Sequence, residues 1–238
     1  MTTWIRLSHP NVLELYGISA HGAYKFALVS PWMEYGDVTG YIRTYPHVKR
    51  SALVLDIIQG LSYLHSLRPP IVHGHLTGKN VLIRPTGKAC LAHVGLAAVW
   101  LDQVESAGDS AEDSCVSPVY ALRWLSPERV MPEHYGLTVP SSFIPEADIY
   151  AFGMVVYEIF AGKLPFYDFL NPWAVLAAIH RGERPQHPGS TARENGLSDT
   201  MWGIVQDCWQ ENYKERPSAN ELVERVAAVV ITDHVSDL

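Results

Sequence analysis

Hydrophobic residues recur at helical spacing in the first third of the chain. Between residues 48 and 67, Val54, Ile57, Leu61 and Leu64 follow one another at three- and four-residue intervals. This is the period of an amphipathic helix that turns one face to a core. The pattern predicts a helix over residues 48–67.

The same period returns after residue 146 and predicts a mainly helical second part. Four further helices are expected, over Asp148 to Ala161, Pro172 to Arg181, Ser198 to Gln210 and Ser218 to Val230. Helices therefore dominate the second two thirds of the chain.

Short apolar runs separated by turn residues predict two hairpins. Val12–Ile18 and Phe26–Val29 form the first pair, and Val81–Ile83 and Ala89–Ala92 form the second, around Pro85-Thr-Gly87. The acidic, serine-containing stretch Leu101–Val119 has no clear period and is expected to be a mobile loop. Phosphorylation of its serines is an open alternative to a merely solvated charged segment; they are Ser106, Ser110, Ser114 and Ser117.

Composition narrows the class of protein. The 238 residues are 47% hydrophobic and carry a formal net charge of −7, which is typical of a folded globular chain and not of a nucleic-acid-binding one. The three cysteines, Cys90, Cys115 and Cys208, have no paired spacing, so we expect neither a disulfide framework nor a zinc module. The longest apolar run, Ile149–Phe160, is too short to span a membrane, and residues 1–12 have no secretory pattern. These features predict a cytoplasmic protein that binds neither nucleic acid nor membrane.

Several short motifs occur in a fixed order and spacing. They are His73-Gly-His-Leu-Thr-Gly-Lys-Asn80 before an apolar strand, His93-Val-Gly95, Ser126-Pro-Glu128, Asp148-Ile-Tyr-Ala-Phe-Gly153, and Arg216-Pro217 after Cys208-Trp209. The first three resemble the H-R-D-L-x-x-x-N, D-F-G and A-P-E elements of protein kinases. The chain as a whole resembles the tyrosine-kinase-like group of that superfamily, of fungal type.

The resemblance implies an α+β, protein-kinase-like fold, mainly the helical C-terminal lobe with a small strand remnant of the N-terminal lobe. The kinase-like domain is expected over residues 1–232, with the strand remnant and hinge at 1–36, the helical lobe at 37–232 and a tail at 233–238. No counterpart of the Gly-rich loop or of the phosphate-clamping Lys is found. The expected consequence is an exposed apolar face around Val12, Leu15, Phe26 and Leu28.

The resemblance also assigns roles to scaffold and nucleotide-site residues. Glu128 and Arg216 correspond to a buried ion pair, and Asp148 to a carboxylate that holds the catalytic-loop backbone. Ser30 corresponds to the gatekeeper; the adenine contacts correspond to Pro31 and Met33 of the hinge and to Leu82 beneath the ring.

The chain departs from the family at the residues that carry out phosphoryl transfer. His75 stands in place of the catalytic-loop Asp, and His93 in place of the D-F-G Asp that binds Mg²⁺. Gly74 and Thr77 replace the catalytic-loop Arg and Lys, whereas Asn80, a Mg²⁺ ligand in the family, is kept. Imidazole is a poor ligand for Mg²⁺, although a His could act as a general base.

These departures favour a catalytically inactive pseudokinase that acts in signal transduction by binding a protein partner, for which another kinase is one candidate. The alternative is an active ATP-dependent Ser/Thr/Tyr kinase whose missing lobe lies outside this chain, and a decayed gene product is a third reading. No cofactor is expected under the first hypothesis, and ATP and Mg²⁺ only under the second. His73, His75, His93 and Asn80 should converge on one cleft, as a hydrogen-bonded group and not as a metal site.

Overall fold

The computed structural model describes residues 4–19, 27–96 and 121–235. The α-helices are α1 (Val38–Thr44), α2 (Arg50–Ser66), α5 (Pro127–Val130), α6 (Pro145–Ala161), α7 (Pro172–His180), α8 (Ser190–Glu194), α9 (Asp199–Cys208) and α10 (Ala219–Val235). The strands are β1 (Gly17–Ser19), β2 (Ala27–Val29), β3 (Val81–Ile83) and β4 (Ala89–Leu91). The 3₁₀ helices are η1 (Trp4–Arg6), η2 (Gly78–Asn80), η3 (Leu122–Trp124), η4 (Pro132–Tyr135), η5 (Pro140–Ser142) and η6 (Tyr213–Glu215).

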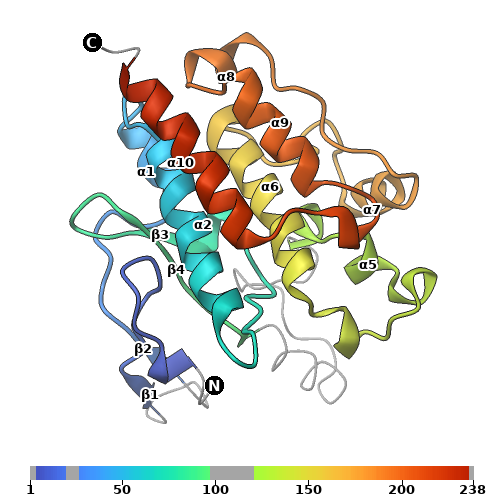
Figure 1. Ribbon diagram of the computed structural model, residues 1–238, viewed down its shortest axis with the longest axis horizontal. Coiled ribbons are helices and arrows are strands. Elements are labelled where there is room, and N and C mark those ends of the chain that lie inside the picture. The colour runs from blue at the N-terminus through green and yellow to red at the C-terminus, as the bar shows by residue number, and fades with distance from the viewer. Residues whose placement is uncertain (1–3, 20–26, 97–120, 236–238) are drawn as a thin grey trace.

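Helix α6 is the centre of the domain. Every residue from 147 to 160 is buried, which is the pattern of a helix that is enclosed on all sides. Helix α2 packs on one side of α6 and α9 on another, while α10 lies along α2 (Figure 1). The four helices predicted after residue 146 and the helix at 48–67 are confirmed, with ends shifted by a few residues.

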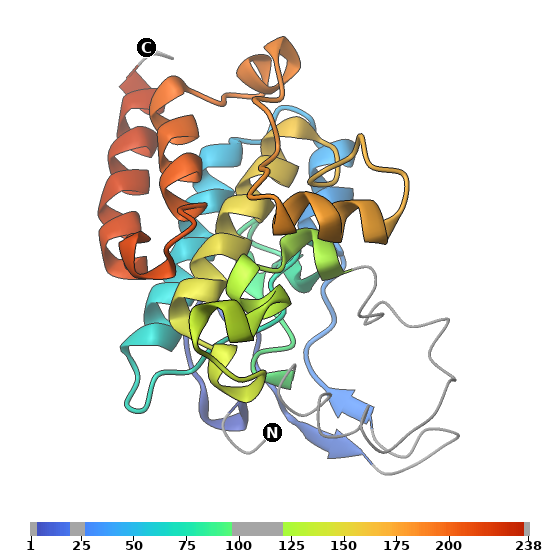
Figure 2. The same cartoon turned by 90° about the vertical axis from the view of Figure 1, so that its right-hand side faces the viewer.

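Two antiparallel two-stranded sheets complete the fold. The β1–β2 hairpin lies at the end of the molecule away from the C-terminus of α10 (Figures 1 and 2). The β3–β4 hairpin lies against α2, and its register places Leu82 opposite Cys90. Both hairpins are confirmed, and the predicted loop at 101–119 lies outside the described residues.

The first hairpin is shorter than expected because its leading segment has another partner. Val12 forms a parallel bridge with Leu91, and the Leu13 N–H donates to the Leu91 carbonyl at 2.8 Å. Val12 and Leu15 are therefore buried, with 1% and 5% of their surface exposed. The expectation that these two residues form an exposed apolar face was wrong, and Phe26 lies outside the described residues.

The α1 helix was not predicted from the sequence. Its seven residues are too few to show a helical period, but the Asp37 carboxylate caps it by accepting the Thr39 and Gly40 N–H groups at 3.0 Å. The capped helix α1 lies beside η2, which follows the first part of the catalytic-loop motif.

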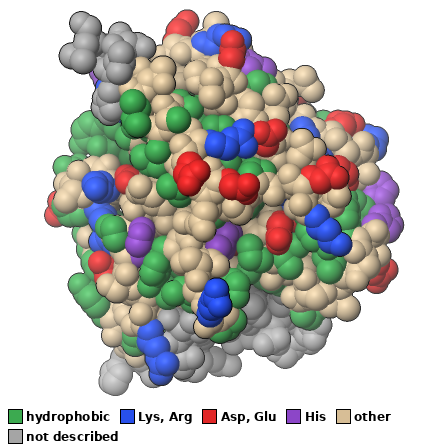
Figure 3. Space-filling view, in the orientation of Figure 1, with side chains coloured by type: hydrophobic (Ala, Val, Ile, Leu, Met, Phe, Trp, Pro, Cys, Tyr) green, Lys and Arg blue, Asp and Glu red, His purple; other side chains and the backbone are tan. Residues whose placement is uncertain are grey.

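Charges of both signs are mixed over the face seen in Figure 3, where no continuous basic field appears. No helix in the described part of the chain is long and apolar enough to cross a membrane.

We predict that Gly60→Ala destabilises the domain by about 1–3 kcal/mol. A Cβ at Gly60 would lie 2.6 Å from the Asn11 carbonyl oxygen, so α2 and the segment before β1 would have to separate. The matched control is Gly203→Ala in α9, where a Cβ would meet nothing within 4 Å. This control should gain about 0.5–1 kcal/mol from helix propensity. Urea denaturation measures both, and equal effects would contradict the close approach.

Candidate functional site

The His73–Asn80 segment is held from the start of α6 by Asp148. Its Oδ2 accepts the His73 N–H at 2.7 Å and its Oδ1 accepts the Gly74 N–H at 2.8 Å. His65 of α2 lies 3.0 Å from Oδ2. Burial would raise the pKa of Asp148, but the hydrogen bond and charge of His65, with further contributions from His73 and Gly74, hold it below its usual value. The expected role of Asp148 in positioning this loop is confirmed.

The other end of the same loop is held by Glu158. Its Oε2 accepts the Gly78 N–H and the Trp124 Nε1–H, each at 3.1 Å. Burial raises the pKa of Glu158 to about 7. A Cβ at Gly78 would lie 2.6 Å from this oxygen, which explains the glycine. The sequence analysis gave Glu158 no role, although a single charge within the apolar run Ile149–Phe160 was the available signal.

Asn80 and His93 form a direct contact within the loop cluster. The Asn80 Nδ2 donates to the His75 carbonyl at 2.7 Å, which turns Oδ1 toward His93 Nδ1 at 3.0 Å. Because Oδ1 can only accept, Nδ1 carries the proton in this contact. His93 adopts a left-handed backbone, with φ of 62°, and Trp4 packs edge-on against its ring at 6.2 Å.

The three histidines of the cluster are neutral near pH 7. Burial lowers the pKa of His73 to about 4. Burial also lowers the pKa of His93, and burial together with the charges of His93 and Arg129 lowers that of His75. The predicted convergence is confirmed for His75, Asn80 and His93, and His73 joins them through its Nδ1, which accepts the His75 N–H at 3.3 Å.

The donor set of this cluster is unsuited to Mg²⁺. Magnesium prefers carboxylate and water oxygens in octahedral geometry. Here one amide oxygen already accepts from an imidazole, and the neighbouring side chains are neutral rings. Within residues 4–19, 27–96 and 121–235, no three His, Cys, Asp or Glu side chains are arranged to hold a metal ion.

The proposed adenine contacts lie around the segment that leads into α1. Met33 is buried, whereas Pro31 and Leu82 are half-buried, and Met33 and Leu82 join the same hydrophobic cluster. Leu82 bridges to Asp37, and the Ile83 N–H donates to the Gly36 carbonyl at 2.9 Å. The contact of these three residues with adenine stays a prediction.

Glu128 and Arg216 form the expected ion pair. The two guanidinium nitrogens meet the two carboxylate oxygens at 2.6 and 2.8 Å, and both side chains are fully buried. Arg216 also donates to the carbonyls of Gln210 and Glu146. The pair joins α5 to the segment before α10.

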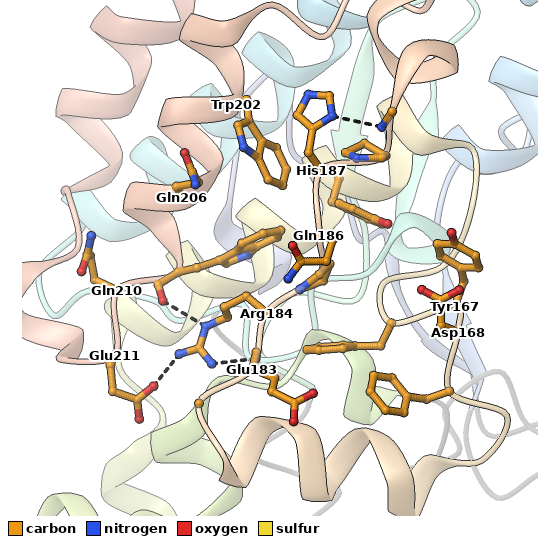
Figure 4. A pocket seen from close by; sticks show the side chains of 18 residues that line it. Tyr167, Asp168, Glu183, Arg184, Gln186, His187, Trp202, Gln206, Gln210 and Glu211 are labelled. Atoms are coloured by element: carbon orange, nitrogen blue, oxygen red, sulfur yellow. Dashed lines mark hydrogen bonds and ion pairs between the residues drawn. The ribbon is translucent and has the colours of Figure 1, made fainter.

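A cavity of about 980 Å³ lies away from this cluster, between the segment after α6 and α9. Figure 4 shows Arg184 reaching Glu211 and the Trp209 and Glu183 carbonyls among aromatic rings, so its charge is already engaged. None of the cavity's lining residues belongs to the catalytic-loop motifs.

A helical lobe with a small strand edge and a loop held by an acidic residue of a buried helix defines the protein-kinase class of domain. The sequence profile described as protein tyrosine and serine/threonine kinase matches residues 1–226. The chain belongs to this family, and its α+β kinase-like fold is as expected.

Curated relatives are kinases of both specificities. The probable serine/threonine-protein kinase roco7 of Dictyostelium discoideum is 28% identical over 240 aligned positions, covering 97% of this chain and 8% of the relative. Another probable serine/threonine-protein kinase of that organism is 32% identical over 183 residues, 76% of this chain and 17% of the relative. The tyrosine-protein kinase Btk of Drosophila melanogaster is 27% identical over 235 residues, 95% of this chain and 27% of the relative. The chain thus spans less than a third of each relative.

We predict that Arg216→Ala lowers the free energy of unfolding by about 3–5 kcal/mol, since Glu128 would remain as a buried charge without its partner. The control is Arg193→Ala, which breaks an exposed pair with Asp199 and should cost less than about 1 kcal/mol. Denaturant unfolding and a double-mutant cycle with Glu128→Gln measure the coupling. A coupling near zero would contradict a structural role for the pair.

The pH dependence of stability should report the buried His73. The unfolded chain binds a proton on this residue below about pH 6.5, whereas the folded chain does so only near about 4. The unfolded state therefore binds more protons in this window, and the stability that His73 contributes above pH 6.5 is lost as pH falls. The full change in the free energy of unfolding that follows from the lowered pKa of His73 is on the order of 3 kcal/mol.

His73→Asn should flatten the rise in unfolding free energy between about pH 5 and 7 relative to the unmodified chain. The variant has to be compared with the unmodified chain because Glu158 also affects the pH dependence of stability. Its raised pKa makes the folded state bind more protons in this window, so its contribution to stability falls as pH rises. Equal slopes for the two proteins would contradict a neutral buried His73.

Proposed function

We propose that this chain is a non-catalytic kinase-like module, of the tyrosine-kinase-like type, that acts in signalling by binding a protein partner. The observation that carries the proposal is the Asn80–His93 hydrogen bond, which stands where the family's H-R-D and D-F-G motifs place an amide and a carboxylate around Mg²⁺. The oxygen that would ligate the metal already accepts from Nδ1. A neutral imidazole supplies no negative charge to attract a cation.

The position of the general base supports the same proposal. His75 replaces the Asp that accepts the substrate hydroxyl proton in active kinases. Its pKa is lowered by burial and by neighbouring positive charge, so it is a weaker base than a free imidazole. Loss of a positioned base costs about 10²- to 10⁴-fold, and loss of the metal removes the electrostatic stabilisation of the transferred phosphoryl group.

The preserved parts of the site are those that hold the fold together. Asp148, Glu158 and the Glu128–Arg216 pair make buried hydrogen bonds to backbone or to one another. A chain that keeps these contacts, but has histidines in place of the family's reactive carboxylates, is suited to bind a partner and not to transfer phosphate. We propose no ATP or Mg²⁺ requirement for this role, and a cytoplasmic location.

An active kinase is the second candidate, because neutral His75 is in the correct protonation state to accept a proton near pH 7. In that case the full protein would supply the remaining parts of the nucleotide site. The two candidates differ in one measurable property, phosphoryl transfer.

We expect no transfer of labelled phosphate from ATP to a generic protein substrate, with Mg²⁺ or Mn²⁺, at any concentration of the chain. His75→Asp should stay inactive, because His93 still provides no carboxylate for the metal. The base and the metal ligand act together in catalysis, so restoring one residue without the other recovers little activity. An active tyrosine or serine/threonine kinase serves as positive control. Transfer that is proportional to the chain and abolished by His75→Ala would instead establish His75 as an unconventional base.

A further inference from the structure

A basic cavity of about 480 Å³ adjoins the catalytic-loop cluster. Side chains from four elements line it: Arg43 from α1, Lys79 from η2, Arg123 from η3 and Lys163 from the segment after α6. The chain as a whole has a net charge of −7, so this grouping runs against the average charge of the molecule. We call this site the basic cavity.

Two of the cations that line the basic cavity have no carboxylate partner within the described ranges. Arg43 is exposed and makes no ion pair there, and Lys163 lies over the Tyr167 ring at 4.3 Å instead of against an acid. Lys79 is 3.0 Å from Asp37, an exposed pair of modest strength. Arg123 is oriented by donating to the carbonyls of Pro165, Phe166 and Phe169.

The one acidic residue in the lining does not offset this charge. Glu158 lies at the buried base of the cavity and is already bonded to two N–H groups. Its raised pKa, caused mainly by burial, leaves it only partly ionised near pH 7. Among the residues that the structure describes, the four cations of the lining are set against Asp37 and Glu158, which leaves an excess of about two positive charges.

The walls of the basic cavity suit a peptide. Tyr167 is 46% exposed, and Leu164 is half-buried beside it, so apolar surface lies next to the cations. A phosphorylated side chain carries a charge of about −1.5 to −2, which matches the excess, whereas a carboxylate carries only one charge. Arg43 can form a two-point contact with phosphate, and Lys163 and Lys79 can act as point charges.

We propose that the basic cavity binds a phosphorylated side chain on a segment of a protein partner. The inference rests on the proposed role of the chain as a protein-binding module, whose partner it characterises by chemistry. The phosphate would lie between Arg43 and Lys163, and the flanking residues of the segment would pack on Tyr167 and Leu164.

The test uses the full chain and three pools of short fluorescein-labelled peptides. The central residue is phosphoserine in one pool, serine in the second and glutamate in the third, and the flanking positions are randomised without cysteine. Fluorescence anisotropy should show the phosphoserine pool binding at least about tenfold more tightly than either other pool, as charge-assisted hydrogen bonds to phosphate predict. Equal binding of the serine pool would overturn the proposal, and equal binding of the glutamate pool would overturn its phosphate specificity.

The variant Arg43→Gln/Lys163→Gln should weaken binding of the phosphoserine pool by about tenfold or more, since it removes the two cations that have no carboxylate partner in the described part of the chain. Both residues are exposed, and thermal melting checks that the variant is folded. The matched control, Arg193→Gln/Lys214→Gln, removes the same charge from α8 and η6 and should change binding by less than about twofold. Similar losses in the two variants would overturn the site.

Failure of this inference can be told apart from failure of the proposed function. A chain that transfers no phosphate but does not distinguish the peptide pools refutes the basic cavity as a phosphate site and leaves the non-catalytic role standing. Transfer of phosphate refutes the non-catalytic role, whatever the peptides do.

Discussion

Two carboxylates of the buried helix α6 hold the loop on which the site depends. Asp148, near the start of α6, takes the N–H groups of His73 and Gly74, and Glu158, ten residues later, takes that of Gly78. Ten residues of α-helix span roughly 15 Å, about the reach of the loop that they clamp. Each carboxylate is enclosed, so each backbone contact forms in a low-dielectric setting, where its loss would leave a buried polar group unsatisfied. This clamp fixes the backbone of the loop at His73, Gly74 and Gly78.

The clamp separates the structural part of the kinase site from its chemical part. The carboxylates that hold backbone are present and engaged, whereas the motif resemblance places His75 and His93 where the family has its reactive carboxylates. The three histidines stay neutral mainly because burial disfavours their charged forms, and for His73 and His75 a charge on a neighbouring histidine would lower the pKa further. Within the cluster, the Asn80 amide oxygen and the protonated Nδ1 of His93 form a hydrogen bond with each other.

The same loop connects this cluster to the basic cavity. Directly after its second clamped residue, Gly78, the loop turns Lys79 outward, where it meets Asp37 at the start of α1. Glu158 contacts the loop on one side and forms the base of the cavity on the other. A ligand in the basic cavity would therefore lie directly against the element that carries the kinase motifs.

The local pattern of the sequence determined the helices α2, α6, α7, α9 and α10, both hairpins and the family motifs, because periodicity and short-range spacing are properties of neighbouring residues. It could also indicate Asp148 and the Glu128–Arg216 pair, since the motif order carries these roles. Only the tertiary structure decided that Val12 and Leu15 are buried, because the segment that contains them pairs through Val12 with Leu91, about eighty residues away in the chain. Likewise, the Asn80–His93 contact and the gathering of Arg43, Lys79 and Lys163 in one cavity depend on how loops and helix ends meet in space. The periodicity of the sequence cannot predict such contacts, because each residue comes from a different element and each contributes a single position.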